Sequence, residues 1–158
     1  MHAVVCTATF ATEKVSALWD EIRPLTAAHH AETSFYKDLP LAPDKDRYLM
    51  MEERGFLRCY TARDADTKRL VGYSIVIVAV NAHHATSPPM ASGDILFLDP
   101  EYRGVGLGRM LVNYGDDQLK AEGVEIVFHH GKHQGNFINT LVRCGYQPCE
   151  LLYTKRLA

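Results

Sequence analysis

Three glycines within five positions constrain this chain more than any other feature of its sequence. They occur in LDPEYRGVGLGRMLV (98–112), between an apolar run and an amphipathic one. A turn from a strand into a helix needs only one glycine, so three of them indicate that something approaches the main chain closely. The first turn of a helix leaves backbone N–H groups without partners and carries the positive end of the helix dipole. The stretch therefore predicts an anion site, with Arg103 in front as a charge-assisted donor to phosphate; the alternative is a tight turn whose glycines serve packing.

Two better-known glycine loops do not fit this stretch. A P-loop ends in Gly-Lys-Ser/Thr, whereas Gly108 is followed by Arg109 and Met110. A dinucleotide fingerprint, G-x-G-x-x-G, needs a glycine where Arg109 stands. That fingerprint also follows the first strand of a parallel sheet, and here the preceding strands are expected to be antiparallel. Neither a P-loop nor a dinucleotide site is therefore expected.

The composition is that of an ordinary folded domain. The 158 residues are 47% hydrophobic and 23% charged, which is enough for one domain over residues 1–158. The net charge of −2 argues against a dominant nucleic-acid surface, and no apolar run approaches the roughly 18 residues of a membrane span. The start has no basic region like that of a signal peptide, and the four cysteines form no C-x-x-C pair. We therefore expect a cytoplasmic protein that binds no membrane and has no dominant nucleic-acid surface, with a local basic patch left open.

Hydrophobic periodicity predicts helices first, and then strands that alternate with helices. A helix beginning at Thr12 has apolar residues at helical spacing, and Pro24 either interrupts it or opens a second helix that continues to residue 36. Further helices are expected at 46–55, 107–121 and 134–145. Strands are expected at 3–10, 56–63, 70–80, 94–99 and 124–128, with a terminal strand or strand pair at 146–157. This order predicts an α+β (mixed α/β) sheet with helices on its faces.

The glycine stretch and its surroundings resemble a known family. Arg103, Gly106 and Gly108 meet the pattern R/Q-x-x-G-x-G/A, and LFLDPEYRGVGLGRMLV resembles motif A of the GNAT superfamily of acetyl-CoA-dependent N-acetyltransferases. CGY (144–146) also stands where that family would have it. The resemblance implies a mostly antiparallel mixed sheet flanked by helices, with two splayed parallel strands at 94–98 and 124–128. The segments HAE (30–32) and E-x-x-Y-x-K-R-L are similar to acetyltransferases of tailed bacteriophages, which would place the protein in a host cytoplasm.

The resemblance also implies how acetyl-CoA would be held. Its pyrophosphate would lie on the amides of the glycine loop, and its pantetheine arm would pair with the strand that precedes the loop. A main-chain N–H near Leu98 would polarise the thioester carbonyl and stabilise the oxyanion. The residues implied in cosubstrate binding are Phe97, Leu98, Asp99, Arg103, Gly104, Val105, Gly106, Leu107, Gly108 and Arg109.

The reaction implied by the resemblance is direct attack of a primary amine, on a small molecule or a protein, on the thioester. An alkyl amine has a pKa of ~10.4 and must lose a proton before it attacks, so a base is needed. Glu32 is the first candidate, with His30 and Asp94 as others. His130 or His133, after the strand 124–128, would shuttle protons or contact the substrate. The alternative for each of these residues is a solvated side chain or a helix cap.

One departure from the family pattern concerns the general acid. Leu141 stands where a tyrosine is usual, so a water molecule, Cys144 or a histidine would have to protonate the leaving thiolate. The departure also keeps open a non-catalytic protein that binds an acyl-CoA or a protein partner. No metal is expected, because neighbouring histidines on a strand point to opposite faces. A homodimer through C-terminal strands, common in this family, is left open.

Overall fold

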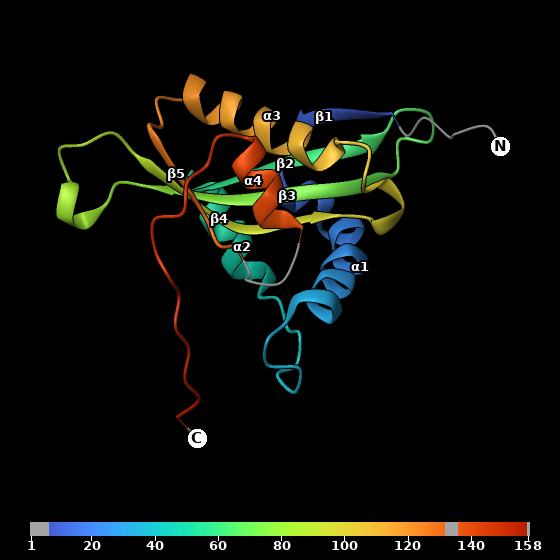
Figure 1. Ribbon diagram of the computed structural model, residues 1–158, viewed down its shortest axis with the longest axis horizontal. Coiled ribbons are helices and arrows are strands. Elements are labelled where there is room, and N and C mark those ends of the chain that lie inside the picture. The colour runs from blue at the N-terminus through green and yellow to red at the C-terminus, as the bar shows by residue number, and fades with distance from the viewer. Residues whose placement is uncertain (1–6, 132–135, 158) are drawn as a thin grey trace.

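The computed structural model describes residues 7–131 and 136–157, which build one five-stranded sheet with helices on both faces (Figure 1). The strands lie in the order β1-β2-β3-β4-β5. They are β1 (Ala8–Thr12), β2 (Leu57–Asp64), β3 (Leu70–Ala79), β4 (Met90–Leu98) and β5 (Ile126–His129). The helices are α1 (Val15–Thr33), α2 (Lys45–Glu53), α3 (Leu107–Ala121) and α4 (Phe137–Arg143), with short 3-10 turns at Ala82–His84 and Pro100–Tyr102.

The pairing of the strands confirms the expected fold class. β1 to β4 pair antiparallel in sequence order, and β5 joins the edge of β4 in parallel. A parallel neighbour requires a crossover connection, and the segment between β4 and β5 contains α3. The protein is therefore an α+β fold with a mostly antiparallel mixed sheet and one parallel pair at its edge.

Two apolar clusters bury the two faces of the sheet. α1 and α2 cover one face, where Val15, Leu18 and Ile22 of α1 pack against buried side chains of β2, β3 and β4. α3 covers the other face, where Leu107, Leu111 and Leu119 form part of the second cluster. Because β3 is covered on both faces, most of its ten residues are buried, which explains its continuous β-branched and apolar sequence.

The first helix differs from the expectation at both ends and in its middle. α1 begins at Val15 rather than Thr12, which ends β1, and it stops at Thr33 instead of reaching residue 36. Pro24 lies inside α1 without ending it, so the predicted interruption is wrong. Proline removes one helical hydrogen bond, but the buried stripe that runs from Val15 to Thr26 holds the helix on the sheet. Thr26 also shares a 2.7 Å hydrogen bond with the hydroxyl of Tyr73.

The predicted C-terminal strand does not form in the part of the chain that the structure describes. Residues 147–157 are extended and largely exposed, and they run away from the sheet (Figure 1). We call them the C-terminal segment. Side chains attach it to the connection between α1 and α2, since Arg156 pairs with Asp38 at 2.9 Å and Tyr36 bonds Thr154 at 3.0 Å. Residues with a high strand propensity form a strand only where a neighbouring strand pairs with them. The C-terminal segment has no such neighbour among the described residues, and side-chain contacts hold it in place instead.

Candidate active site

The strands β4 and β5 pair over only part of their length. Their register runs from Met90 opposite Ile126 to Gly93 opposite His129, where β5 ends. β4 continues through 94–98, paired there with β3 alone. The strands thus separate after Gly93, and we call the side of β4 that faces away from β3 over 94–98 the open edge. The expected strands 94–99 and 124–128 are displaced in the structure, because β4 begins four residues earlier and β5 is only four residues long.

Asp94 lies at a β-bulge where the two strands separate. Ile75 of β3 is opposite Ile95 and Val76 is opposite Gly93, so Asp94 has no partner across the ladder. Bulges often occur beside active sites, where they redirect a side chain. Ile95 packs against the α1/α2 side, and the exposed Asp94 accepts a 2.9 Å hydrogen bond from Tyr48 of α2. The carboxylate is thus on the face of the sheet that carries α1 and α2.

The main-chain groups of β4 alternate between β3 and the open edge. The N–H of Asp99 donates to Val71 of β3 at 2.7 Å, and Phe97 is opposite Tyr73. Because antiparallel pairs alternate, Phe97 and Asp99 direct their main-chain groups to β3, while Leu96 and Leu98 direct theirs to the open edge. Phe97, Leu98 and Asp99 are the residues expected at the pantetheine arm, and of these only Leu98 presents its main chain to the open edge.

The glycine loop connects the open edge to α3. Gly104 and Gly106 have φ angles of 86° and 87°, in the left-handed region that favours glycine, and Gly106 is the N-cap of α3. Across the described ranges 7–131 and 136–157, no acceptor takes a hydrogen bond from the N–H groups of Gly104 to Arg109. A Cβ on Gly104 or Gly106 would meet open space. The loop therefore offers a run of main-chain donors at a helix N-terminus, as an anion site requires.

Arg103 turns back from this loop toward β4 and α1. Its Nε donates to the carbonyl of Leu98 at 2.8 Å, and its two terminal nitrogens bind Glu32 of α1 at 2.8 Å each. The guanidinium also lies 5.4 Å from the ring centre of Phe97. The guanidinium is thus engaged by Glu32 and Leu98, and its contact with a phosphate stays a prediction. The side chain connects α1 to the end of β4.

This ion pair changes the chemistry expected of Glu32. The Arg103 guanidinium holds the pKa of Glu32 below its ordinary value of 4.5, mainly through the two hydrogen bonds. A carboxylate in a bidentate ion pair is a weak proton acceptor. His30 lies in the last turn of α1, two residues before Glu32, and His130 is exposed after β5. His133, the other histidine considered, lies outside the described residues.

Arg109 remains available in the first turn of α3. Its side chain is exposed, and no carboxylate in the described part of the chain forms an ion pair with it. It is thus the cation of the loop that is free to meet an anion. The sequence contains both arginines in the same motif and does not indicate which of them is engaged.

A cluster on the α3 face was not recognised from the sequence. His129 packs over Gly93, where a Cβ would collide with its ring, and its ring centre is 5.2 Å from that of Tyr146. Burial lowers the pKa of His129 to about 4. Tyr146 donates a 2.6 Å hydrogen bond to Asp116 of α3, whose pKa is raised by burial. The histidine doublet drew attention to His130, yet His129 is the one held at the point where β4 and β5 separate.

Leu141, at the position where the family usually has its general acid, and Cys144, a possible substitute, have different environments. Leu141 is buried, 7% exposed, and packs as a core residue of α4. Cys144 lies 3.8 Å from the carbonyl of Arg109, and burial raises the pKa of its thiol. Leu141 has no proton to give, and Cys144 remains a neutral thiol near pH 7 that has one to donate.

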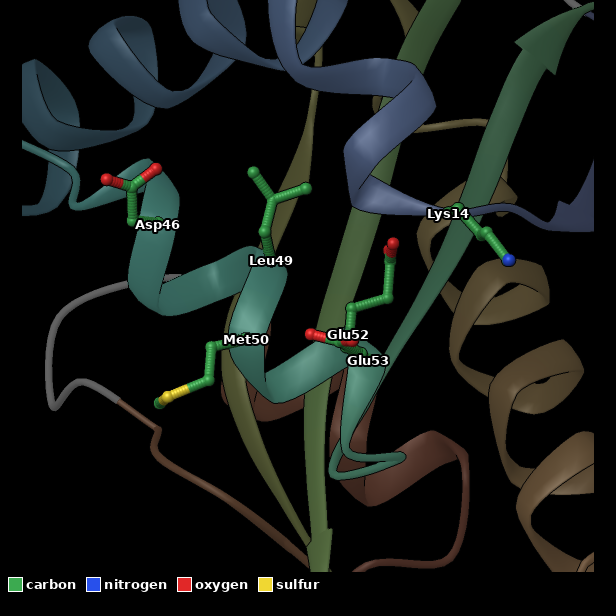
Figure 2. Close-up of a pocket in the computed structure, with 6 residues that line it drawn as sticks. All are labelled: Lys14, Asp46, Leu49, Met50, Glu52 and Glu53. Atoms are coloured by element: carbon green, nitrogen blue, oxygen red, sulfur yellow. The ribbon is translucent and has the colours of Figure 1, made fainter.

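A depression of about 610 Å³ lies on the outer side of α2 (Figure 2). It is lined by Lys14, Asp46, Leu49, Met50, Glu52 and Glu53. Glu52 accepts hydrogen bonds from the backbone and side chain of Ser16, so it caps the first turn of α1. None of the candidate site residues lines this depression, and its acidic groups have a structural role or face solvent.

Neither a metal-binding cluster nor a membrane-spanning helix occurs among the described residues. No three His, Cys, Asp or Glu side chains within 7–131 and 136–157 come together in a way that could hold a metal ion. Within the same ranges no helix is both long and apolar enough to cross a membrane. Cys59, Cys144 and Cys149 are free thiols.

Comparison with known proteins places the chain in a family. A family model described as "Acetyltransferase (GNAT) family" matches residues 18–146. The chain therefore belongs to the acetyltransferase (GNAT) family, and this membership supports acyl transfer as its general activity. A search of curated proteins finds no match to the sequence.

Solved structures share the fold at low sequence identity. A ribosomal-protein-alanine N-acetyltransferase from Brucella melitensis biovar Abortus 2308 is 15% identical, with a TM-score of 0.71 over 96% of this chain and 100% of the other. An aminoglycoside acetyltransferase from an uncultured soil metagenomic sample is 16% identical, with a TM-score of 0.70 over 94% and 97%. Glucosamine-6-phosphate N-acetyltransferase from Arabidopsis thaliana is 13% identical, with a TM-score of 0.70 over 95% and 99%. At these identities the likeness establishes the fold.

Proposed function

We propose that the protein transfers an acetyl group from acetyl-CoA to a primary amine, on a small molecule or a protein. The observation that carries this proposal is the run of main-chain N–H groups from Gly104 to Arg109, at the end of the open edge, which have no acceptor among the residues that the structure describes. A diphosphate fits such donors, and Arg109 adds a free cation beside them. The open edge of β4 offers the main chain of Leu96 and the N–H of Leu98 to an extended arm in the same way that it would accept another strand; the carbonyl of Leu98 is taken by Arg103.

The acetyl group would then lie near the bulge, since the open edge leads from the loop back to Asp94. The amine nitrogen attacks the thioester carbon, an N–C bond forms, and the C–S bond breaks. The ammonium proton passes to a base, and the departing thiolate takes a proton from water, because Cys144 lies beside Arg109 at the loop end and not at the bulge. We propose Asp94 as the base in preference to Glu32, because Asp94 is exposed at the bulge and is bonded to a neutral phenol rather than to a guanidinium.

The competing function is that of a GNAT-fold protein that binds an acyl-CoA or a protein partner without turnover. Leu141, buried where the family usually has a tyrosine, is the observation that favours it. Incubation of the protein with acetyl-CoA and a panel of primary amines separates the two functions. We expect amine-dependent release of free thiol together with an acetylated product detected by mass spectrometry. Binding of CoA without stimulation by any amine would favour the non-catalytic protein.

Two further features of the protein are also proposed. We propose a homodimer, because exposed apolar side chains gather on the C-terminal segment (Leu151, Leu152, Tyr153 and Leu157) beside the exposed Leu39. A light-scattering mass equal to that of one chain would contradict it.

We propose a cytoplasmic location, that of a host cell if a bacteriophage encodes the chain, because the described cysteines are free; disulfides in the purified native protein would argue against it.

A further inference from the structure

The hydroxyl of Tyr48 has a defined place beside the bulge. It donates to Oδ2 of Asp94 at 2.9 Å, across 46 residues of sequence. The tyrosine ring belongs to the apolar cluster between α1, α2 and the sheet, and its centre lies 6.1 Å from that of Trp19. The hydroxyl is therefore positioned by the packing of a helix against the sheet and not by a mobile surface side chain.

The hydrogen bond leaves half of the carboxylate free. Tyr48 takes Oδ2, and no donor in the described part of the chain binds Oδ1. Burial and the neighbouring Asp94 raise the pKa of Tyr48, so the phenol keeps its proton at neutral pH and acts as a donor only. A carboxylate with two equivalent oxygens rotates freely about its Cβ–Cγ bond, whereas one held at a single oxygen presents the other in one direction.

We propose that Tyr48 is a positioning residue that holds Asp94 with Oδ1 directed at the attacking amine. The proposal rests on the proposed acetyl transfer and on Asp94 as its base. In the step, the amine forms the N–C bond, its proton passes to Oδ1, and the C–S bond breaks as the thiolate leaves and is protonated. Tyr48 exchanges no proton in this step; it keeps the accepting oxygen within hydrogen-bonding reach of the nitrogen.

A second Tyr–Asp pair in the same protein provides a matched control. Tyr102 donates to Oδ2 of Asp64 at 2.7 Å at the end of β2, and its side chain is buried. The substitutions Tyr48→Phe and Tyr102→Phe each remove one hydroxyl and keep the ring. Each variant leaves one carboxylate without its phenol donor, so any loss of stability from that change alone is common to both variants.

The test measures kcat and KM for the wild type, Y48F, Y102F, D94N and the double variant Y48F/D94N, with circular dichroism to verify folding. We expect Y48F to lower kcat about tenfold with an unchanged KM for acetyl-CoA, while Y102F keeps the wild-type kcat. In the D94N background, Y48F should have no further effect, because the base that it positions is gone.

The outcomes distinguish a failure of the positioning role of Tyr48 from a failure of the proposed acetyl transfer. An active wild type in which Y48F has the kcat of Y102F overturns the positioning role and leaves acetyl transfer intact. An undiminished tenfold loss on adding Y48F to D94N overturns it as well, since Tyr48 would then act independently of Asp94. A wild type that transfers acetyl to no amine overturns the proposed function and this inference together.

Discussion

The two ends of the open edge of β4 each hold a carboxylate, and the two carboxylates have different partners. At the loop end, Glu32 is bound at both oxygens by the Arg103 guanidinium, 2.8 Å from each. At the bulge end, Asp94 is bound at one oxygen by the neutral hydroxyl of Tyr48. The charged partner stabilises the ionised form of Glu32 and removes it from proton transfer, whereas the neutral partner orients Asp94 and leaves one oxygen free. At the loop end the ion pair thus connects α1 to the end of β4, whereas the carboxylate at the bulge end is suited to accepting a proton.

The largest effect is expected from a charge placed in the glycine loop. Gly106→Asp should weaken CoA binding at least a hundredfold, because a carboxylate would repel the diphosphate at donors that the anion needs. Isothermal calorimetry with CoA measures the affinity. Gly123→Asp is the control, since Gly123 has φ 85° at the other end of α3 and its Cβ also meets open space. Equal affinities for the two variants would overturn the anion site.

The next effect tests the assignment of the base. Asp94→Asn should lower kcat about a hundredfold while the affinity for acetyl-CoA stays unchanged, because the amide cannot accept the proton. Glu32→Gln should lower kcat less than about threefold, since its carboxylate is engaged by Arg103. Steady-state kinetics with one amine acceptor compares the two. If Glu32→Gln were the more damaging change, the assignment would have to be reversed.

The third effect separates the two arginines of the loop. Arg109→Ala should raise the Kd for CoA about tenfold, as expected for the loss of one charge-assisted contact, and the difference should shrink at high salt. Arg103→Ala should raise it less, because its guanidinium is already bound to Glu32 and Leu98. A larger loss for Arg103→Ala would mean that CoA binding releases the ion pair and recruits Arg103.

The smallest effect concerns stability and pH. Because Arg103 lowers the pKa of Glu32, the pair stabilises the fold above the ordinary value of 4.5 and loses that contribution as the pH falls through the lowered pKa. The two side chains are 39% and 47% exposed, so solvent screens the pair. Glu32→Gln should therefore cost less than about 1 kcal/mol at pH 7, and the difference from the wild type should vanish in acid. Denaturant titrations at pH 7 and pH 3 measure it, and a constant difference at both would exclude the ion pair as its cause.

Much of the fold could be predicted because it follows from local patterns. The amphipathic stretch after the glycines predicted the helix Leu107–Ala121 at its observed bounds, and the long apolar run predicted the buried strand β3. The predictions that were wrong depended on distant contacts. Pro24 stays inside α1 because the helix packs on the sheet, and the residues after 146 form no described strand because no neighbouring strand pairs with them. A local pattern states a preference, and packing can override it.

The sequence by itself determined the fold class, the helix Leu107–Ala121 and the buried strand β3, and it predicted an anion loop, because each depends on residues within a few positions of one another. Only the tertiary structure decided which charges are engaged. Glu32 and Arg103 are 71 residues apart, and Tyr48 and Asp94 are 46 residues apart. The choice between Glu32 and Asp94 as the base depends on contacts between side chains of different helices and strands. These contacts are set by how the helices pack on the sheet, and the periodicity of hydrophobic residues along the sequence does not predict them.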